Sequence, residues 1–133
     1  MTGERDLRTL LHRMRPELHP GRYVYTTLPG GEVPAGVTPV VTVSEREGLT
    51  LVVPEAQAVT SGLEHHFVAG WITLRVHSAP EAVGLTAAVC LALTDAGISC
   101  NVVAGFHHDH LFVPYTRAAE AVRVLEALAE ESA

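Results

Sequence analysis

The chain has 133 residues, 47% of them apolar, which is enough for one packed domain or for two small intertwined modules. Its nine arginines and fifteen acidic residues give a formal net charge of −6, a balance that argues against binding to a nucleic-acid backbone. The N-terminus is charged at once, and no run of apolar residues approaches the about 18 that a membrane span needs. We therefore expect a cytoplasmic protein without nucleic-acid or membrane partners.

The N-terminal half is predicted to contain two helices and three strands. In chain order these are a helix over 4–14, a strand over 22–28, a hairpin of strands 40–45 and 49–53, and a helix over 54–62. The first helix ends before Pro16, and Gly48 lies in the hairpin turn. The glycine- and proline-rich stretch 29–39 predicts a surface loop.

The stretch from Trp71 to Tyr115 carries the clearest pattern in the chain. Trp71, Thr73 and Arg75 alternate with apolar residues, which predicts a strand over 67–76. The following sequence, Ser78-Ala-Pro-Glu81, is a capping box with proline in the first turn, and it predicts the start of a helix.

That helix is predicted over residues 81–96, ending before Gly97. It is apolar on almost every side, so we expect one face to lie against a sheet and another against a second module or subunit. Cys90 in this helix and Cys100 beyond it read as small buried apolar side chains of a reducing compartment, and a disulfide between them stays open on counting alone.

Two more strands are predicted, over 98–103 and 111–115, around a polar tip at 105–110. A last helix is predicted after a Thr116 cap, with one apolar face formed by Ala121, Val124, Leu125 and Leu128. The order strand, helix, strand, strand, helix lacks the fourth strand of a ferredoxin-like unit. We therefore expect strand exchange, with the fourth strand supplied by the N-terminal half, from 22–28 or the hairpin, or by a neighbouring subunit.

The central stretch resembles the ACT domain. The resemblance rests on Glu81-Ala-Val-Gly84, on Leu85-Thr-Ala-Ala, and on Ala92-Leu-Thr-Asp-Ala-Gly-Ile-Ser-Cys-Asn101-Val-Val. ACT domains have an Asp-x-Pro-Gly turn before an alanine-rich helix that ends in Ala-Gly-Ile. Here Glu81 stands where aspartate is common, and Val83 stands where the proline is usual.

The whole chain is similar to small free-standing bacterial proteins with two ACT-like modules. The resemblance implies an α+β fold of two ferredoxin-like (βαββαβ) modules, with an N-terminal ACT-like module over residues 1–64 and a C-terminal ACT domain over 65–133. It also implies a regulatory protein that binds a free amino acid or a similar small ligand and reports it to a regulated enzyme or other protein partner. Exposed strand edges favour a symmetric homodimer.

A candidate ligand site lies where the turn before the central helix faces the next strand. A helix N-terminus favours a carboxylate, and a glycine lets a ligand approach closely. The candidate residues are Ser78, Glu81, Val83, Gly84, Leu85, Asn101 and Val102. Glu81 would hold an ammonium group, and the Asn101 amide can both donate and accept. The alternative is that Ser78 and Glu81 merely cap the helix, so that the chain is a dimerisation or interaction module without a ligand.

The cluster His107-His108-Asp109-His110 is a second candidate, either as a pocket rim or as a metal site. Alternate residues of a strand point to opposite faces, so His108 and His110 would share one face and His107 and Asp109 the other. The simpler alternative is a polar hairpin tip.

Catalysis has no support from a motif. The sequence lacks a nucleophile elbow, a phosphate-binding loop and a dinucleotide fingerprint. Cys90 lies mid-helix on an apolar face, which disfavours the thiolate that a nucleophile needs. We expect no enzyme activity, no catalytic residue and no cofactor.

Overall fold

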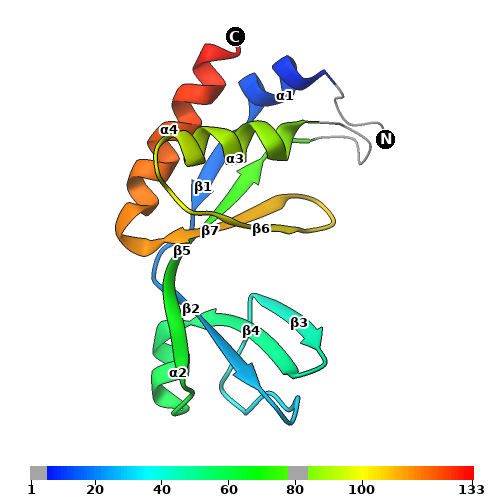
Figure 1. Cartoon of the computed structure of the whole chain (residues 1–133), viewed down its shortest axis with the longest axis vertical. Helices are drawn as coiled ribbons and strands as arrows, with labels where there is room; N and C mark the ends of the chain where they lie inside the picture. Colours follow the sequence, from blue (N-terminus) through cyan, green and yellow to red (C-terminus); the bar gives the residue numbers. More distant parts are fainter. Residues whose placement is uncertain (1–5, 78–83) are drawn as a thin grey trace. The chain divides into compact units, whose positions relative to one another are not determined.

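The computed structural model describes residues 6–77 and 84–133 (Figure 1). Its elements in chain order are α1 Leu7–Arg13, β1 Arg15–Leu18, β2 Tyr23–Leu28, β3 Val41–Glu45, β4 Gly48–Pro54, α2 Glu55–Thr60, β5 His65–Arg75, α3 Leu85–Asp95, β6 Asn101–Ala104, β7 Asp109–Pro114, the 3₁₀ turn η1 Tyr115–Arg117, and α4 Ala118–Glu131. Within the described ranges, no helix is long and apolar enough to cross a membrane.

The chain forms two compact units. The terminal unit comprises residues 1–19 and 70–133, and the central unit comprises residues 20–69. The N-terminal residues therefore pack with the C-terminal half, so the spatial units do not follow a single cut of the sequence. The division into modules 1–64 and 65–133 stays a prediction.

The terminal unit is a ferredoxin-like unit whose fourth strand comes from the N-terminus. The second half of β5, then α3, β6, β7 and α4, follow the predicted order. Strand β1 pairs antiparallel with β5, from Arg15 opposite Arg75 to Leu18 opposite Ile72. The expected strand exchange is confirmed, but the terminal unit takes its fourth strand from β1, a short segment after Met14 that was not predicted as a strand.

The central unit repeats the same strand order. Strand β2 lies between β4 and the first half of β5, and β3 pairs with β4 across the predicted hairpin turn. Residues 22–28 therefore join the sheet that contains Trp71, as predicted, but they pair with residues 65–69 of β5 and do not supply the fourth strand of the terminal unit. Residues 29–40 contain no helix or strand and take the place of the first helix. Strand β5 is thus the last strand of the central unit and the first of the terminal unit.

The core of the terminal unit lies between its strands and its three helices, which Figure 1 shows packed side by side. Leu10 and Met14 are fully buried, so α1 contributes to this core as much as the C-terminal elements do. Helix α3 faces the core with Leu85, Val89 and Leu93. Leu91, by contrast, is 62% exposed, so one apolar face of α3 is open in the single chain.

Two predicted helix starts are wrong. Gly84 has φ +99°, a left-handed conformation that a right-handed helix cannot include, so α3 begins at Leu85 rather than at residue 81. Thr116 does not cap the last helix, because it lies inside η1 and α4 begins two residues later. Next to Thr116, the Arg117 guanidinium links this turn to the end of α3. It donates hydrogen bonds to the carbonyl oxygens of Ala96 and Gly97, at 3.0 and 2.8 Å.

The packing of α1 predicts a large difference between two leucine truncations. Leu10→Ala should lower the free energy of unfolding by about 2–5 kcal/mol, because it leaves a cavity in the core. Leu91→Ala, the matched control on an exposed helix face, should change it by no more than about 0.5 kcal/mol. Urea denaturation of both variants measures the difference. Equal effects would show that α1 is not part of this core.

Candidate functional site

The N-terminus of α3 is the first candidate site. No side chain among the described residues caps it, so within those residues the N–H groups of its first turn have no side-chain acceptor. The Thr86 hydroxyl, in this first turn, donates to Asp109 Oδ2 at 3.2 Å. The positive end of the helix and a carboxylate therefore lie beside each other, which is the pair of charges that a zwitterion would meet.

The structure places the predicted site residues in different surroundings. Ser78, Glu81 and Val83 lie outside the described residues. Gly84 directly precedes α3, and a Cβ built on it would approach Leu7 Cδ2 to 3.1 Å. Because of this contact and its left-handed φ, a side chain at Gly84 would disturb folding as well as any pocket.

Asn101 and Val102 begin strand β6, and their side chains point to opposite faces. Val102 packs against the core beneath the helices, so Asn101 faces the other side of the sheet. Ala104, the strand's last residue, pairs with Asp109 and lies three positions after Asn101, which is about 10 Å along an extended strand. The contact at the start of α3 is therefore made by Asp109, whereas Asn101 is not brought to it.

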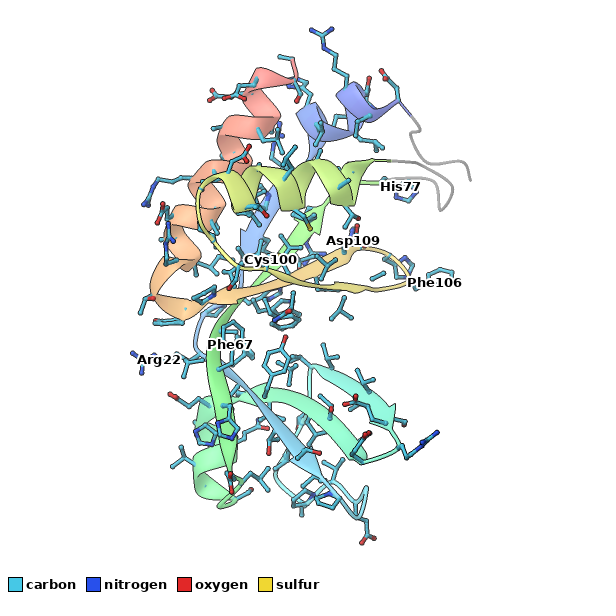
Figure 2. All side chains as sticks on the ribbon, viewed as in Figure 1. Arg22, Phe67, His77, Cys100, Phe106 and Asp109 are labelled. Carbon is cyan, nitrogen blue, oxygen red and sulfur yellow. The ribbon has the colours of Figure 1, made fainter. Side chains whose placement is uncertain are left out.

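The four residues of the hairpin tip are divided in the same way. Asp109 contacts Thr86 of α3, whereas His110 contacts Trp71 on the opposite face. Exposed His107 packs against Phe106, which Figure 2 shows at the outer end of the hairpin. His108 Nδ1 is buried without a hydrogen-bond partner in the described structure. No group of three or more histidine, cysteine, aspartate or glutamate side chains within residues 6–77 and 84–133 is arranged to hold a metal ion.

A second polar cluster lies on the sheet face away from the helices, and the sequence did not predict it. We call it the histidine cluster and define it as His19, Trp71, Thr73 and His110. The His19 ring stacks on Trp71 at 3.6 Å between centroids. The Thr73 oxygen, on a side chain 1% exposed, lies 2.7 Å from His19 Nε2 and 3.0 Å from His110 Nδ1.

The hydrogen bond from Trp71 sets the protonation state of His110. The indole N–H can only donate, and it lies 3.1 Å from His110 Nδ1. Nδ1 must therefore accept, so the ring is neutral and carries its proton on Nε2. Burial lowers the pKa of His110, and the neighbouring His108 and His19 lower it further. Burial also lowers the pKa of His19, partly opposed by the Glu17 carboxylate.

An ion pair borders the histidine cluster. Arg75 Nε donates to Glu17 Oε1 at 2.8 Å, and this hydrogen bond holds the pKa of Glu17 below its usual value. The alternation of Trp71, Thr73 and Arg75 was visible in the sequence. Their partners Glu17 and His19 were not expected there, because β1 was not predicted as a strand.

Comparison with known proteins places the chain in a family. One ACT domain model matches residues 2–70, and a second ACT domain model matches residues 67–127. The two matches overlap inside β5, the strand that both units share. The chain belongs to the ACT domain family, whose members are regulatory modules, and the resemblance found in the sequence is confirmed.

Solved structures agree with this assignment. A Vibrio cholerae protein of unknown function, described as a possible transport protein, is 43% identical with a TM-score of 0.83, over 94% of this chain and 97% of that chain. An Agrobacterium tumefaciens protein is 19% identical with a TM-score of 0.72, over 88% and 90% of the two chains. The ligand-free regulatory subunit of Thermus thermophilus aspartate kinase is 9% identical with a TM-score of 0.62, over 85% and 95%, and shares the fold. No curated protein matches the chain.

The histidine cluster predicts an acid-sensitive fold. Because the pKa values of His19 and His110 are lowered, the unfolded chain binds more protons than the folded chain once the pH falls below about 6.5. The free energy of unfolding should therefore decrease as the pH falls from about 6.5 toward the lowered folded values.

Urea denaturation of the wild type and of His110→Asn at several pH values between pH 8 and pH 5 measures this effect. Asparagine keeps an acceptor for Trp71 but cannot gain a proton, so the variant should lose less stability than the wild type on acidification. His66→Asn, at a side chain that is 82% exposed, controls for the removal of an imidazole. An unchanged acid dependence in His110→Asn would contradict the assigned neutral state.

Proposed function

We propose that this ACT-family chain is a small-molecule sensor that binds a free amino acid and reports it to a protein partner, such as a regulated enzyme, in the cytoplasm. The observation that carries the proposal is the pair of ACT matches that together span residues 2–127. The likeness in fold to a regulatory subunit of aspartate kinase, crystallised in a form described as ligand-free, supports it. The expectations of no enzyme activity and no cofactor belong to the same proposal.

The ligand site that we propose is the turn and first helical residues at Ser78, Glu81, Val83, Gly84 and Leu85. The N–H groups of the first turn of α3 would receive the ligand carboxylate, and its partial positive charge would stabilise that carboxylate. Each charge of a zwitterion needs a partner when it is buried.

For the ammonium group we propose Glu81 together with Asp109. Asp109 supports this role because it already contacts Thr86 in the first turn of α3. In this proposal Asp109 takes the place of Asn101 and Val102. Asn101 lies on the other face of the sheet, and the Val102 side chain packs against the core.

The alternative function is an ACT-type dimerisation module that binds no ligand, and the homodimer is part of both proposals. Two features support self-association. Leu91 on α3 is an exposed apolar side chain, and β6 is an edge strand, and exposed apolar surfaces and strand edges favour contacts with another chain. A sedimentation experiment at tens of micromolar should find a dimer, and a monomer there would argue against the proposal.

A thermal-shift screen of the twenty amino acids tests the sensor function, because a ligand that binds only the folded state must raise the Tm. For whichever amino acid raises it, calorimetric titration should show that Glu81→Gln and Asp109→Asn each weaken binding by about 1.5–3 kcal/mol, through loss of a charged hydrogen bond. Both substitutions keep the side-chain shape.

Glu64→Gln is the matched control, since that side chain is 90% exposed and lies in the central unit. It should bind as the wild type does. If no amino acid shifts the wild type, the interaction module without a ligand becomes the better account. If one does but both variants bind normally, the site lies elsewhere in the chain.

A further inference from the structure

A hollow between α1 and α4 takes no part in the histidine cluster or in the proposed ligand site. The two helices pack side by side (Figure 1), and the surface between them is hollowed over a volume of about 360 Å³. Small-molecule sites have volumes of about 300–1,000 Å³. We call this feature the α1–α4 hollow and define it by its apolar floor, Met14, Pro16 and Ala129, and its polar walls, His12, Arg15, Glu126 and Glu130.

The floor of the hollow is fixed by the core of the terminal unit. Met14 is fully buried and Ala129 is 6% exposed, and both belong to the core cluster that joins α1 to α4. Pro16, at the start of β1, is half-buried. The shape of the hollow therefore depends on packed side chains rather than on a loop.

The wall formed by α4 carries two carboxylates. Glu126 and Glu130 are four positions apart in this helix, so they lie on one helix face with their Cβ atoms about 5–6 Å apart. Within the described parts of the chain neither carboxylate has a hydrogen bond or an ion pair, whereas Glu120 of the same helix is paired with Arg117. Like charges at this spacing repel each other, and a cation bound between them would remove that repulsion.

The opposite wall supplies a third acceptor. His12 Nδ1 lies 3.2 Å from the carbonyl oxygen of Ala129. Because a carbonyl oxygen can only accept, Nδ1 carries the proton, and Nε2 of the neutral ring is left as an acceptor.

The guanidinium of Arg15 also lines the hollow, but it is bound to the backbone. Its Nη1 donates to the carbonyl oxygens of His12 and Met14, both at 2.8 Å, at the end of α1. It makes no ion pair with the α4 carboxylates in the described structure. The hollow thus combines an apolar floor with three acceptors whose negative charge is not neutralised by a neighbouring side chain.

We propose that the α1–α4 hollow binds a small primary amine. In this complex the ammonium group donates to Glu126, Glu130 and His12 Nε2, so that its three N–H donors match three acceptors. The alkyl chain lies against Pro16 and Ala129. A carboxylate ligand would be repelled by the two glutamates, and a neutral ligand would leave them unpaired. The start of α3 has no part in this site, so the binding goes beyond the proposed sensor function and does not rest on it.

Binding of the amine should be weak and sensitive to salt. Both glutamates are exposed, and an ion pair in contact with water contributes little and is screened by added ions. The apolar floor adds a contribution that grows with the apolar area covered. Affinity should therefore increase from ethylamine to n-butylamine and decrease when sodium chloride is added.

An NMR titration of the full chain with n-butylamine hydrochloride tests the site residue by residue. Backbone amide signals of residues 12–16 and 126–131 should shift and reach saturation. n-Butanol, which has the same alkyl chain without the charge, should give no saturable shift at the same concentrations. Absence of a saturable shift with the amine would overturn the proposal. So would a saturable shift confined to the start of α3, which would place the amine in the other site.

Substitutions on α4 test the two carboxylates separately from folding. Glu126→Gln and Glu130→Gln each remove one charge and keep the side-chain shape, so each should weaken binding of n-butylamine by about two- to fivefold, and the double variant by about tenfold. Neither substitution should lower the Tm, because no contact within the described structure is lost.

Glu131→Gln is the matched control, since it removes the same charge from the same helix at a position that does not line the hollow. It should bind n-butylamine as the wild type does. Wild-type affinity in the double variant, or an equal loss in Glu131→Gln, would show that the two glutamates do not hold the ammonium group.

Discussion

The antiparallel pairing of β1 with the second half of β5 is the constraint on which the terminal unit depends. Within its described residues the C-terminal half supplies three strands, and Arg15–Leu18 completes the sheet as the fourth. Helix α1 directly precedes β1, so the same pairing brings Leu10 and Met14 into the core. The central unit is completed in a similar way by the first half of β5, which makes β5 a strand that both ferredoxin-like units need.

The same pairing also builds the histidine cluster. Side chains alternate along β5, so Ile72 and Leu74 enter the core while Trp71 and Thr73 lie on the other face. His19, the residue that directly follows β1, contacts both of these outer residues. A protein that loses the β1 pairing would therefore lose core packing on one face and the contacts of His19 with Trp71 and Thr73 on the other. The contact between Thr86 of α3 and Asp109 is made by the β6–β7 hairpin rather than by β1. The proposed ligand site is therefore separate from the histidine cluster.

Most of the fold could be predicted from local patterns, because long apolar periodicities and glycine turns leave a clear signal in the sequence. The hairpin at Gly48 is an example. Strand β1 could not be found this way, since four residues that include Pro16 have no measurable alternation. The start of α3 was misplaced because a capping box before Gly84 reads like a helix, whereas only the φ of Gly84 shows where the helix begins.

The candidate site was less predictable than the fold. Which residue faces α3 depends on strand register, and a shift of one residue moves a side chain to the opposite face. The predicted strand began at residue 98, but β6 begins at Asn101, with Asp109 on the helix side of the sheet. The contacts of the histidine cluster join residues 37 and 54 positions apart, and no local pattern reports such a contact.

Amide hydrogen exchange of the intact chain, followed peptide by peptide, tests most directly the claim that the N-terminal segment completes the C-terminal module. If α1 and β1 belong to the core of the terminal unit, amides in residues 7–18 should exchange as slowly as those in β7 and α4, because they open only with the whole unit. Rapid exchange in residues 7–18, with β7 and α4 still protected, would contradict the account.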